Sequence, residues 1–247
     1  MTQIQNVRRF DGVDDWLKLT STDFVTAFGP LTFLTIIKTD IDPDVNYEAI
    51  LSITGGTGGR FSFEVVDFPG QSPGITGYFD SPGAGFDNHG YFSPAMGWCL
   101  VGFTKPDGSS VTVRCHRYRY DTQEWDHSDF AAHDVSEGPA PAGAANMHIG
   151  TWTGSFEFLD ADVAVVGGWM NDELSDGEIE GLTDRITAWD ALNPTGLWLL
   201  NQSSVTETVL DRAGAGNQIG RNGTSVVTPT GLDFDVEVAP FASVTIR

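Results

Sequence analysis

Two segments of the chain gather the side-chain types that recognise carbohydrate. Aromatic rings stack on the apolar face of a sugar, and Asp, Asn and His side chains hydrogen-bond its hydroxyl groups. Residues 68–96 supply Tyr78, Asp87, Asn88, His89 and Tyr91, and residues 121–146 supply Trp125, Asp126 and His127. We interpret both segments as long loops, where binding residues concentrate. Their rings could instead pack these loops onto the fold, and a shared rim would favour the carbohydrate site.

A short cationic segment, RCHRYRY, follows at residues 114–120. On a β-strand, alternation places one set of these side chains on one face: Arg114, His116, Tyr118 and Tyr120. The opposite face then carries Cys115, Arg117 and Arg119. Because Arg and Tyr are common anchors at interfaces, this segment is a candidate contact surface for an acidic subunit or a glycan. The alternative is a sheet face whose arginines neutralise nearby acids of the same chain.

Carboxylates in the same two segments suggest calcium, which prefers carboxylate and carbonyl oxygens. The candidate ligands are Asp87, Asn88, Asp121, Asp126 and Asp129. A solvated acidic rim is the alternative, since the chain has 34 Asp and Glu residues. We recognise no zinc-ligand spacing among His89, His116, His127 and His133 and interpret them as surface or strand-face residues.

Catalytic motifs are weak in this sequence. Retaining glycoside hydrolysis needs two carboxylates about 5 Å apart, and the nearest candidates are Glu157, Asp160 and Asp162. Strand alternation would place Glu157 on the face opposite the other two. The glycine-rich residues 54–60 lack the Gly-Lys-Ser/Thr ending of a phosphate-binding loop and fit a hairpin turn. We therefore expect no enzyme activity and, calcium apart, no cofactor.

The net charge of −21 opposes binding to nucleic acid or to an anionic membrane. It could reflect a salt-adapted host or a GC-rich genome. The first fifteen residues lack the apolar core of a secretion signal, and no apolar run reaches the length of a membrane span. We expect a product made in the host cytoplasm without membrane insertion. Cys99 and Cys115 are either a cross-strand disulfide or two buried thiols.

Short alternating segments separated by Gly, Pro and Asp predict an antiparallel two-sheet sandwich. Asp11-Gly12 predicts a turn after a first edge strand. The expected strands are residues 16–19, 31–38, 48–54, 61–66, 98–104, 111–120, 147–150, 156–166, 196–200 and 234–238. The pattern predicts one helix near residues 175–191, which begins with a Ser175–Glu178 capping box. Its apolar face is Ile179, Leu182, Ile186 and Trp189.

Several stretches resemble the laminin-G-like, concanavalin-A-type jelly-roll family. They are FDGVDDWLKL, LTFLTIIKTD, GWCLVGFTKPDGSSVTVRCHRY and, with most specificity, MHIGTWTGSFEFLDADVAVVGGWMNDELSDGEIEGL. The resemblance implies a jelly roll over residues 1–192. Residues 193–247 would supply closing strands and an attachment segment of the same domain, with residues 234–238 and 244–246 as short β segments that a neighbouring subunit could accept.

The stretch TGLWLLNQSSVTETVLDRAGAGNQIGRNGTSVV resembles the closing segment of such domains in structural proteins of tailed bacteriophages. This implies a non-enzymatic virion protein, most simply a minor tail or tail-tip protein that also binds a host-surface glycan. A capsid decoration protein is the alternative within that class. A free carbohydrate-binding lectin or a divergent glycoside hydrolase are alternatives of another class. The expected partners are other virion proteins and host polysaccharide, with the chain present in several copies or as a homo-oligomer.

Overall fold

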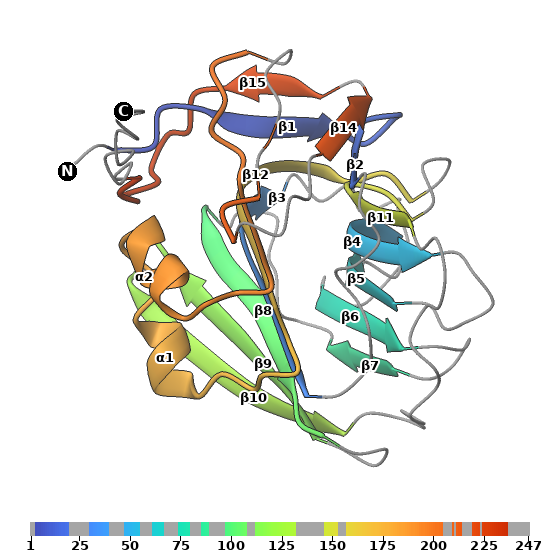
Figure 1. The fold of residues 1–247 in the computed structure, drawn as a ribbon, viewed down its shortest axis with the longest axis vertical. Coiled ribbons are helices and arrows are strands. Elements are labelled where there is room, and N and C mark those ends of the chain that lie inside the picture. Colours follow the sequence, from blue (N-terminus) through green and yellow to red (C-terminus); the bar gives the residue numbers. More distant parts are fainter. Residues whose placement is uncertain are drawn as a thin grey trace, which may run out of the picture.

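The computed structural model describes most of the chain, and all structural statements below refer to this part. The described residues are 3–19, 30–39, 47–54, 61–66, 74–79, 85–88, 97–107, 112–131, 146–152, 157–204, 209, 211–213, 219–222 and 224–236. Among them, two antiparallel sheets and two short helices form an all-β sandwich with a helical layer on one side (Figure 1).

The first sheet contains eight described strands. Their order is β10 (Glu124–Ala131), β9 (Thr112–Arg119), β8 (Cys99–Lys105), β3 (Leu31–Thr39), β12 (Asp160–Met170), β1 (Val7–Asp11) and β15 (Ser225–Val227), and β13 (Gly196–Leu199) pairs with β12. The second sheet has the order β14 (Ile219–Asn222), β2 (Trp16–Leu19), β11 (Asn146–Ile149), β4 (Tyr47–Thr54), β5 (Phe61–Val66), β6 (Gly74–Phe79) and β7 (Gly85–Asn88). Strands β13 and β15 belong to the first sheet and β14 to the second, so residues 193–247 contribute strands to both sheets.

The two sheets enclose the main apolar core. It includes Phe33, Phe63, Phe103 and Val163, none of which is more than marginally exposed. Because strand side chains alternate between faces, the central strand β3 contributes Phe33 to this core and Leu34 to the opposite face. The sheet is therefore apolar on both faces, and its outer face needs a cover.

That cover is the helical layer, formed by α1 (Asp176–Glu180) and α2 (Ile186–Ala191) (Figure 1). Ser175 caps α1 in the predicted capping box, and Ile179, Leu182, Ile186 and Trp189 all lie in the second apolar cluster. The predicted apolar face is thus confirmed, but the single helix is wrong. The chain leaves helical geometry between the two helices, where Arg185 forms a bridge with Asp235.

Most predicted strands are present within a few residues of their expected bounds, but residues 68–96 and 121–146 are not simple loops. The first contains β6 and β7, and the second contains β10. Strand β12 begins at Asp160 instead of Phe156 and continues to Met170. Within residues 234–236 only Asp235 forms isolated bridges, with Gln3 and Arg185, so the predicted strand is wrong there. Residues 237–238 and 244–246 lie outside the described residues.

The cysteines do not face one another across the β8–β9 pair. The register places Cys99 opposite Arg119 and Cys115 opposite Phe103, so both remain buried free thiols. Burial raises the pKa of the Cys99 thiol to about 12. Of the two options for the cysteines, the structure shows the buried thiols. A search of the described residues finds no helix with the length and hydropathy that a membrane span requires.

Candidate functional site

The β9–β10 hairpin brings the two predicted groups of functional residues together. Its register places Trp125 opposite Tyr118, Asp126 opposite Arg117 and His127 opposite His116. The turn uses neither Gly nor Pro: Gln123 adopts a φ of 58° and its N–H donates to the Arg119 carbonyl at 2.8 Å. Trp125, Asp126 and His127 therefore lie on a strand and not, as the sequence suggested, on a loop.

The hairpin carries a polar pocket of about 350 Å³, which is lined by Arg117, Arg119, Glu124, Trp125 and Asp126. Strand alternation places all of these except Trp125 on the face turned away from the helices. Arg117 donates to Asp126 at 2.8 Å, and the Ser128 hydroxyl donates to the other oxygen of the Asp126 carboxylate at 3.0 Å. At the turn, Arg119 donates to both oxygens of Asp121 and lowers the pKa of that carboxyl. The pocket thus presents two cations from β9 opposite two anions from β10.

The helix-facing side of the hairpin is aromatic. The Trp125 ring stacks on His127 with 5.0 Å between centroids and 10° between planes, and Tyr118 lies 5.0 Å away from Trp125. Tyr118, Tyr120 and Trp125 pack against the helical cluster, and the Tyr120 hydroxyl donates to the Thr183 carbonyl. The predicted two-face pattern of residues 114–120 is confirmed. Because rings of the same chain stack on Trp125, its indole is not arranged as an open sugar platform.

Beside this stack lies a histidine pair that the sequence did not reveal. His116 Nδ1 and His127 Nδ1 are 2.9 Å apart, and His116 Nε2 lies 2.9 Å from the Thr104 hydroxyl. His127 Nε2 lies 3.2 Å from Glu180 on α1. Burial, reinforced by His127, lowers the pKa of His116 to about 3, which keeps its imidazole neutral.

Helix α1 completes the cluster through Asp176, whose Oδ1 lies 3.8 Å from Nδ1 of both His116 and His127. Arg114 donates its Nε to Asp176 Oδ1 at 2.6 Å and its Nη1 to Asp129 at 2.7 Å. The Arg114 hydrogen bonds hold the pKa of Asp176 below its usual range. Three arginines of the predicted interface, Arg114, Arg117 and Arg119, therefore pair with acids of their own chain.

The remaining sugar-site candidates are placed only in part. Tyr78 lies on β6, and Asp87 and Asn88 lie on β7, whereas His89 and Tyr91 fall outside the described residues. Strands β7 and β10, which belong to different sheets, come into contact. The backbone thus brings the two predicted segments to one region of the sandwich.

The calcium candidates on the hairpin do not converge on one another. Asp121, Asp126 and Asp129 each form an ion pair, with Arg119, Arg117 and Arg114 in turn, so calcium stays a prediction.

A separate carboxylate group, Asp11, Asp14 and Asp15, lies in the turn between β1 and β2. Asp15 accepts a hydrogen bond from the Asp11 N–H at 3.0 Å.

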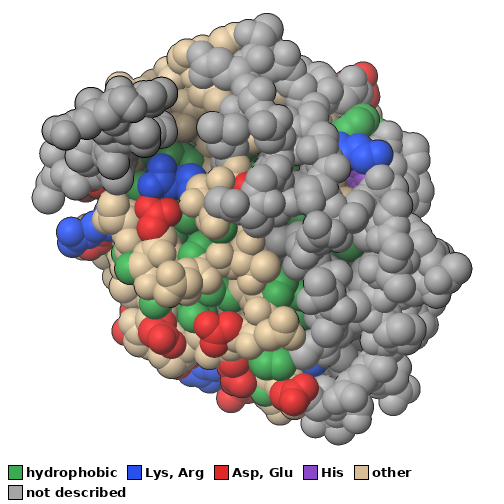
Figure 2. Space-filling model, in the orientation of Figure 1, with side chains coloured by type: hydrophobic (Ala, Val, Ile, Leu, Met, Phe, Trp, Pro, Cys, Tyr) green, Lys and Arg blue, Asp and Glu red, His purple; other side chains and the backbone are tan. Residues whose placement is uncertain are grey.

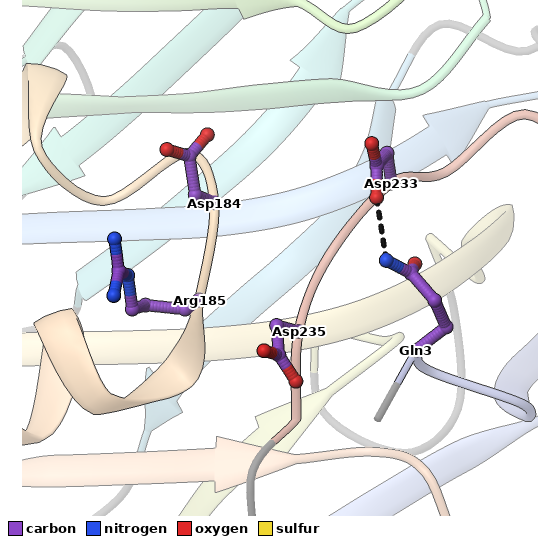
Figure 3. Close-up of a pocket in the computed structure, with 5 residues that line it drawn as sticks. All are labelled: Gln3, Asp184, Arg185, Asp233 and Asp235. Atoms are coloured by element: carbon purple, nitrogen blue, oxygen red, sulfur yellow. Dashed lines mark hydrogen bonds between the residues drawn. The ribbon is translucent and has the colours of Figure 1, made fainter. Parts of the chain in front are cut away.

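A second described pocket, of about 300 Å³, joins both ends of the described chain (Figure 3). Asp184 and Arg185 enter it between the helices, and Asp233 accepts a hydrogen bond from Gln3 at 2.6 Å. Asp235 completes the lining and joins the neighbouring backbone through bridges to Gln3 and Arg185. Acidic side chains dominate its described lining, in which no residue is aromatic, whereas the hairpin pocket includes Trp125.

The carboxylates considered for glycoside hydrolysis have structural partners. Asp160 and Asp162 both form ion pairs with Arg9. Glu157 precedes strand β12, with a φ of 55°, so strand alternation does not apply to it. Burial raises the pKa of Glu157. Absence of enzyme activity stays a prediction.

The fold of this chain is similar to that of a protein of known structure. No family model and no curated protein matches the sequence. The heptameric SAP-like pentraxin of Limulus polyphemus is similar in structure, with a TM-score of 0.59 and 11% identity over 93% of this chain and 97% of that one. This likeness supports a β-sandwich of the same general kind, and the laminin-G-like assignment stays a prediction.

Two further solved structures match with lower TM-scores. Tailspike protein 2 of the Escherichia coli O157:H7 bacteriophage CAB120 gives 0.47 with 14% identity, over 69% of this chain and 23% of that one. Scytalido-glutamic peptidase, solved with a peptide-based transition state analogue, gives 0.30 with 12% identity, over 90% of this chain and 98% of that one. The chain is therefore a β-sandwich that shares its fold with a pentraxin.

Proposed function

We propose that this protein is a non-enzymatic recognition module of a virus particle and that it binds a host-surface polysaccharide through the β9–β10 hairpin. The observation that carries the binding part is the hairpin pocket, in which the donors Arg117 and Arg119 on β9 lie opposite the acceptors Asp126 and Glu124 on β10. The virion part rests on the resemblance of residues 195–227 to closing segments of phage structural proteins.

The chemistry of the pocket suits a polyhydroxylated ligand. Each sugar hydroxyl can donate one hydrogen bond and accept others, so it bonds best where N–H donors and carboxylate oxygens lie side by side. A guanidinium carries five N–H donors and a carboxylate about four lone-pair positions, so both groups are suited to bonding several hydroxyls of one ligand.

The charge of the pocket favours a neutral sugar over a phosphate. Arg117 and Arg119 are balanced by Glu124 and Asp126 within the lining itself. The whole chain carries −21, and Figure 2 shows acidic side chains spread over the described part of one face with few basic ones. Polyanionic ligands would therefore be repelled at long range.

Arg117→Gln tests the binding site, because it removes the cation and leaves a shorter, neutral polar side chain. We expect binding to a polysaccharide found by glycan screening to weaken at least about tenfold, the usual cost of losing a hydrogen bond to a charged group. Arg212→Gln is the matched control, since Arg212 pairs with Asp190 at 2.6 Å with similar side-chain exposure but away from the hairpin.

The binding of wild type, Arg117→Gln and Arg212→Gln to immobilised polysaccharides would be compared. Equal binding by wild type and Arg117→Gln would remove the hairpin from the proposal. Absence of binding by the wild type to any surface polysaccharide would remove the carbohydrate ligand altogether.

The virion assignment needs its own measurement, which is mass spectrometry of purified particles followed by imaging with a tagged copy. Finding the chain at the tail tip supports the proposal. Finding it across the capsid would make it a decoration protein, and absence from particles would favour a free lectin.

A further inference from the structure

We propose that His116, His127 and Asp176 form a binding site for a divalent transition-metal ion of the zinc type, which fastens helix α1 to the β9–β10 hairpin. The three ligand atoms are Nδ1 of each histidine and Oδ1 of the aspartate. They come from three elements, β9, β10 and α1, so no metal-ligand spacing in the sequence predicts them.

The distances among these atoms fit a metal of this size. The two nitrogens are 2.9 Å apart, and each lies 3.8 Å from the carboxylate oxygen. A triangle with these sides has a circumradius of about 2.1 Å, which is the length of a zinc–nitrogen or zinc–oxygen bond. An ion at that point would contact all three atoms without any of them moving.

The outer contacts of the histidines match those of metal-bound imidazoles. A ligating histidine usually donates its other ring N–H to a carboxylate or a similar acceptor. Here Nε2 of His127 faces Glu180 at 3.2 Å, and Nε2 of His116 faces the Thr104 hydroxyl at 2.9 Å. With both Nε2 atoms protonated, both Nδ1 lone pairs point into the cluster, an arrangement that a cation stabilises.

Without an ion, one proton on His116 Nδ1 is enough to form the hydrogen bond to His127 Nδ1. The Thr104 hydroxyl then donates to His116 Nε2. Metal binding then moves that proton to His116 Nε2 and turns the Thr104 hydroxyl into an acceptor. The exchange changes hydrogen positions and leaves the heavy atoms in place.

The charges around the cluster also favour a dication. Asp176, Asp129 and Glu180 contribute three negative charges and Arg114 one positive charge. The net charge of about −2 among these groups equals the charge that the ion would neutralise. Nitrogen ligands select ions of the zinc series over calcium and magnesium, which prefer oxygen.

Three protein ligands leave at least one coordination position for water. The ion would hold α1 against the hairpin whose opposite face forms the sugar pocket, because Arg117 and Asp126 directly follow and precede the two histidines. The metal site does not depend on the proposed sugar binding.

Titration of the full-length, metal-stripped protein with Zn²⁺ tests the site, with Co²⁺ as a spectroscopic probe. We expect one Zn²⁺ bound per chain, an upward shift of the melting temperature, and visible Co²⁺ bands of a nitrogen- and oxygen-ligated, low-coordinate ion. An excess of Ca²⁺ should not compete.

Two histidine variants decide where the ion binds. His127→Gln retains an N–H donor for Glu180 and should weaken Zn²⁺ binding at least about tenfold and abolish the Co²⁺ bands. His148→Gln, which removes a buried histidine of the other sheet, should leave both unchanged. Unchanged affinity in His127→Gln, or a wild type that binds neither ion, would overturn the proposal.

Discussion

At the scale of single residues, the buried carboxyl of Asp15 makes stability depend on pH. Its side chain is only 5% exposed, and burial, followed by the charge of Asp11, raises its pKa from 3.8 to about 6. Because the folded-state pKa exceeds the unfolded one, Asp15 favours folding most below about pH 4. That contribution is lost as the pH rises through 6, and the ionised carboxylate then destabilises the fold.

Asp15→Asn should therefore stabilise the protein at pH 7 to 8, by about 1–2 kcal/mol after allowance for solvent screening. The amide oxygen can still accept the hydrogen bond from the Asp11 N–H. Thermal melts at pH 4 and pH 8 measure the effect, with the exposed Asp107→Asn as control. An equal change at both pH values would argue against ionisation as its cause.

Gly150, which directly follows β11, shows how closely the end of that strand packs against β1. Its φ is +91°, and a Cβ atom there would lie 2.4 Å from Cδ1 of Phe10. Gly150→Ala should cost about 3 kcal/mol or more through steric overlap and backbone strain. Gly177→Ala is the control, because its Cβ would meet nothing within 4 Å and should change the unfolding free energy by no more than about 1 kcal/mol. Urea denaturation gives both values, and similar results for the two variants would refute this packing.

At the scale of elements, alternation of apolar and polar residues was enough to predict β3, β4, β5 and β8, and the capping box predicted the start of α1. The β9–β10 hairpin could not be predicted in the same way. Its turn, Tyr120 to Gln123, contains neither Gly nor Pro. Gln123 adopts the left-handed backbone conformation for which a glycine in the sequence is the usual signal. The histidine pair was missed for this reason, since pairing Arg119 with Glu124 automatically places His116 opposite His127.

The capping box of α1 should make a measurable contribution to stability. The Ser175 hydroxyl accepts from the Glu178 N–H, and the Glu178 carboxylate accepts from the Ser175 N–H at 2.8 Å. Ser175→Ala should cost about 0.5–2 kcal/mol, whereas Ser175→Asp, which can still cap, should cost less. Urea midpoints compare the two variants. Equal losses would show that the hydroxyl contributes through something other than capping.

At the scale of the whole molecule, residues 232–236 contribute to the core. Leu232, Phe234 and Val236 pack in the cluster that joins the helices to the first sheet, and the Ile4 N–H donates to the Phe234 carbonyl at 3.0 Å. The sequence predicted an attachment segment within residues 193–247, and this stays a prediction. Apolar alternation alone cannot distinguish a strand that pairs with a neighbouring subunit from one that packs within its own chain.

Deletion of residues 229–247 should therefore destabilise the fold by several kcal/mol, since three buried apolar side chains are removed. Deletion of residues 237–247 leaves this cluster intact and should cost much less. Thermal melts of the two truncated chains provide the comparison. Equal stability of both would mean that residues 229–236 contribute little to the core.

The two faces of the β9–β10 hairpin differ: the charged lining of a polar pocket lies on one face and a histidine cluster under α1 on the other. The charged lining faces away from the helices, and we expect the ligand to bind there. The most direct measurement is hydrogen–deuterium exchange with and without a polysaccharide identified by screening. Binding at the hairpin should slow exchange at the backbone amides of residues 117–126. Protection over the acidic pocket of Gln3, Asp184 and Asp235 instead, with none at the hairpin, would contradict this binding site.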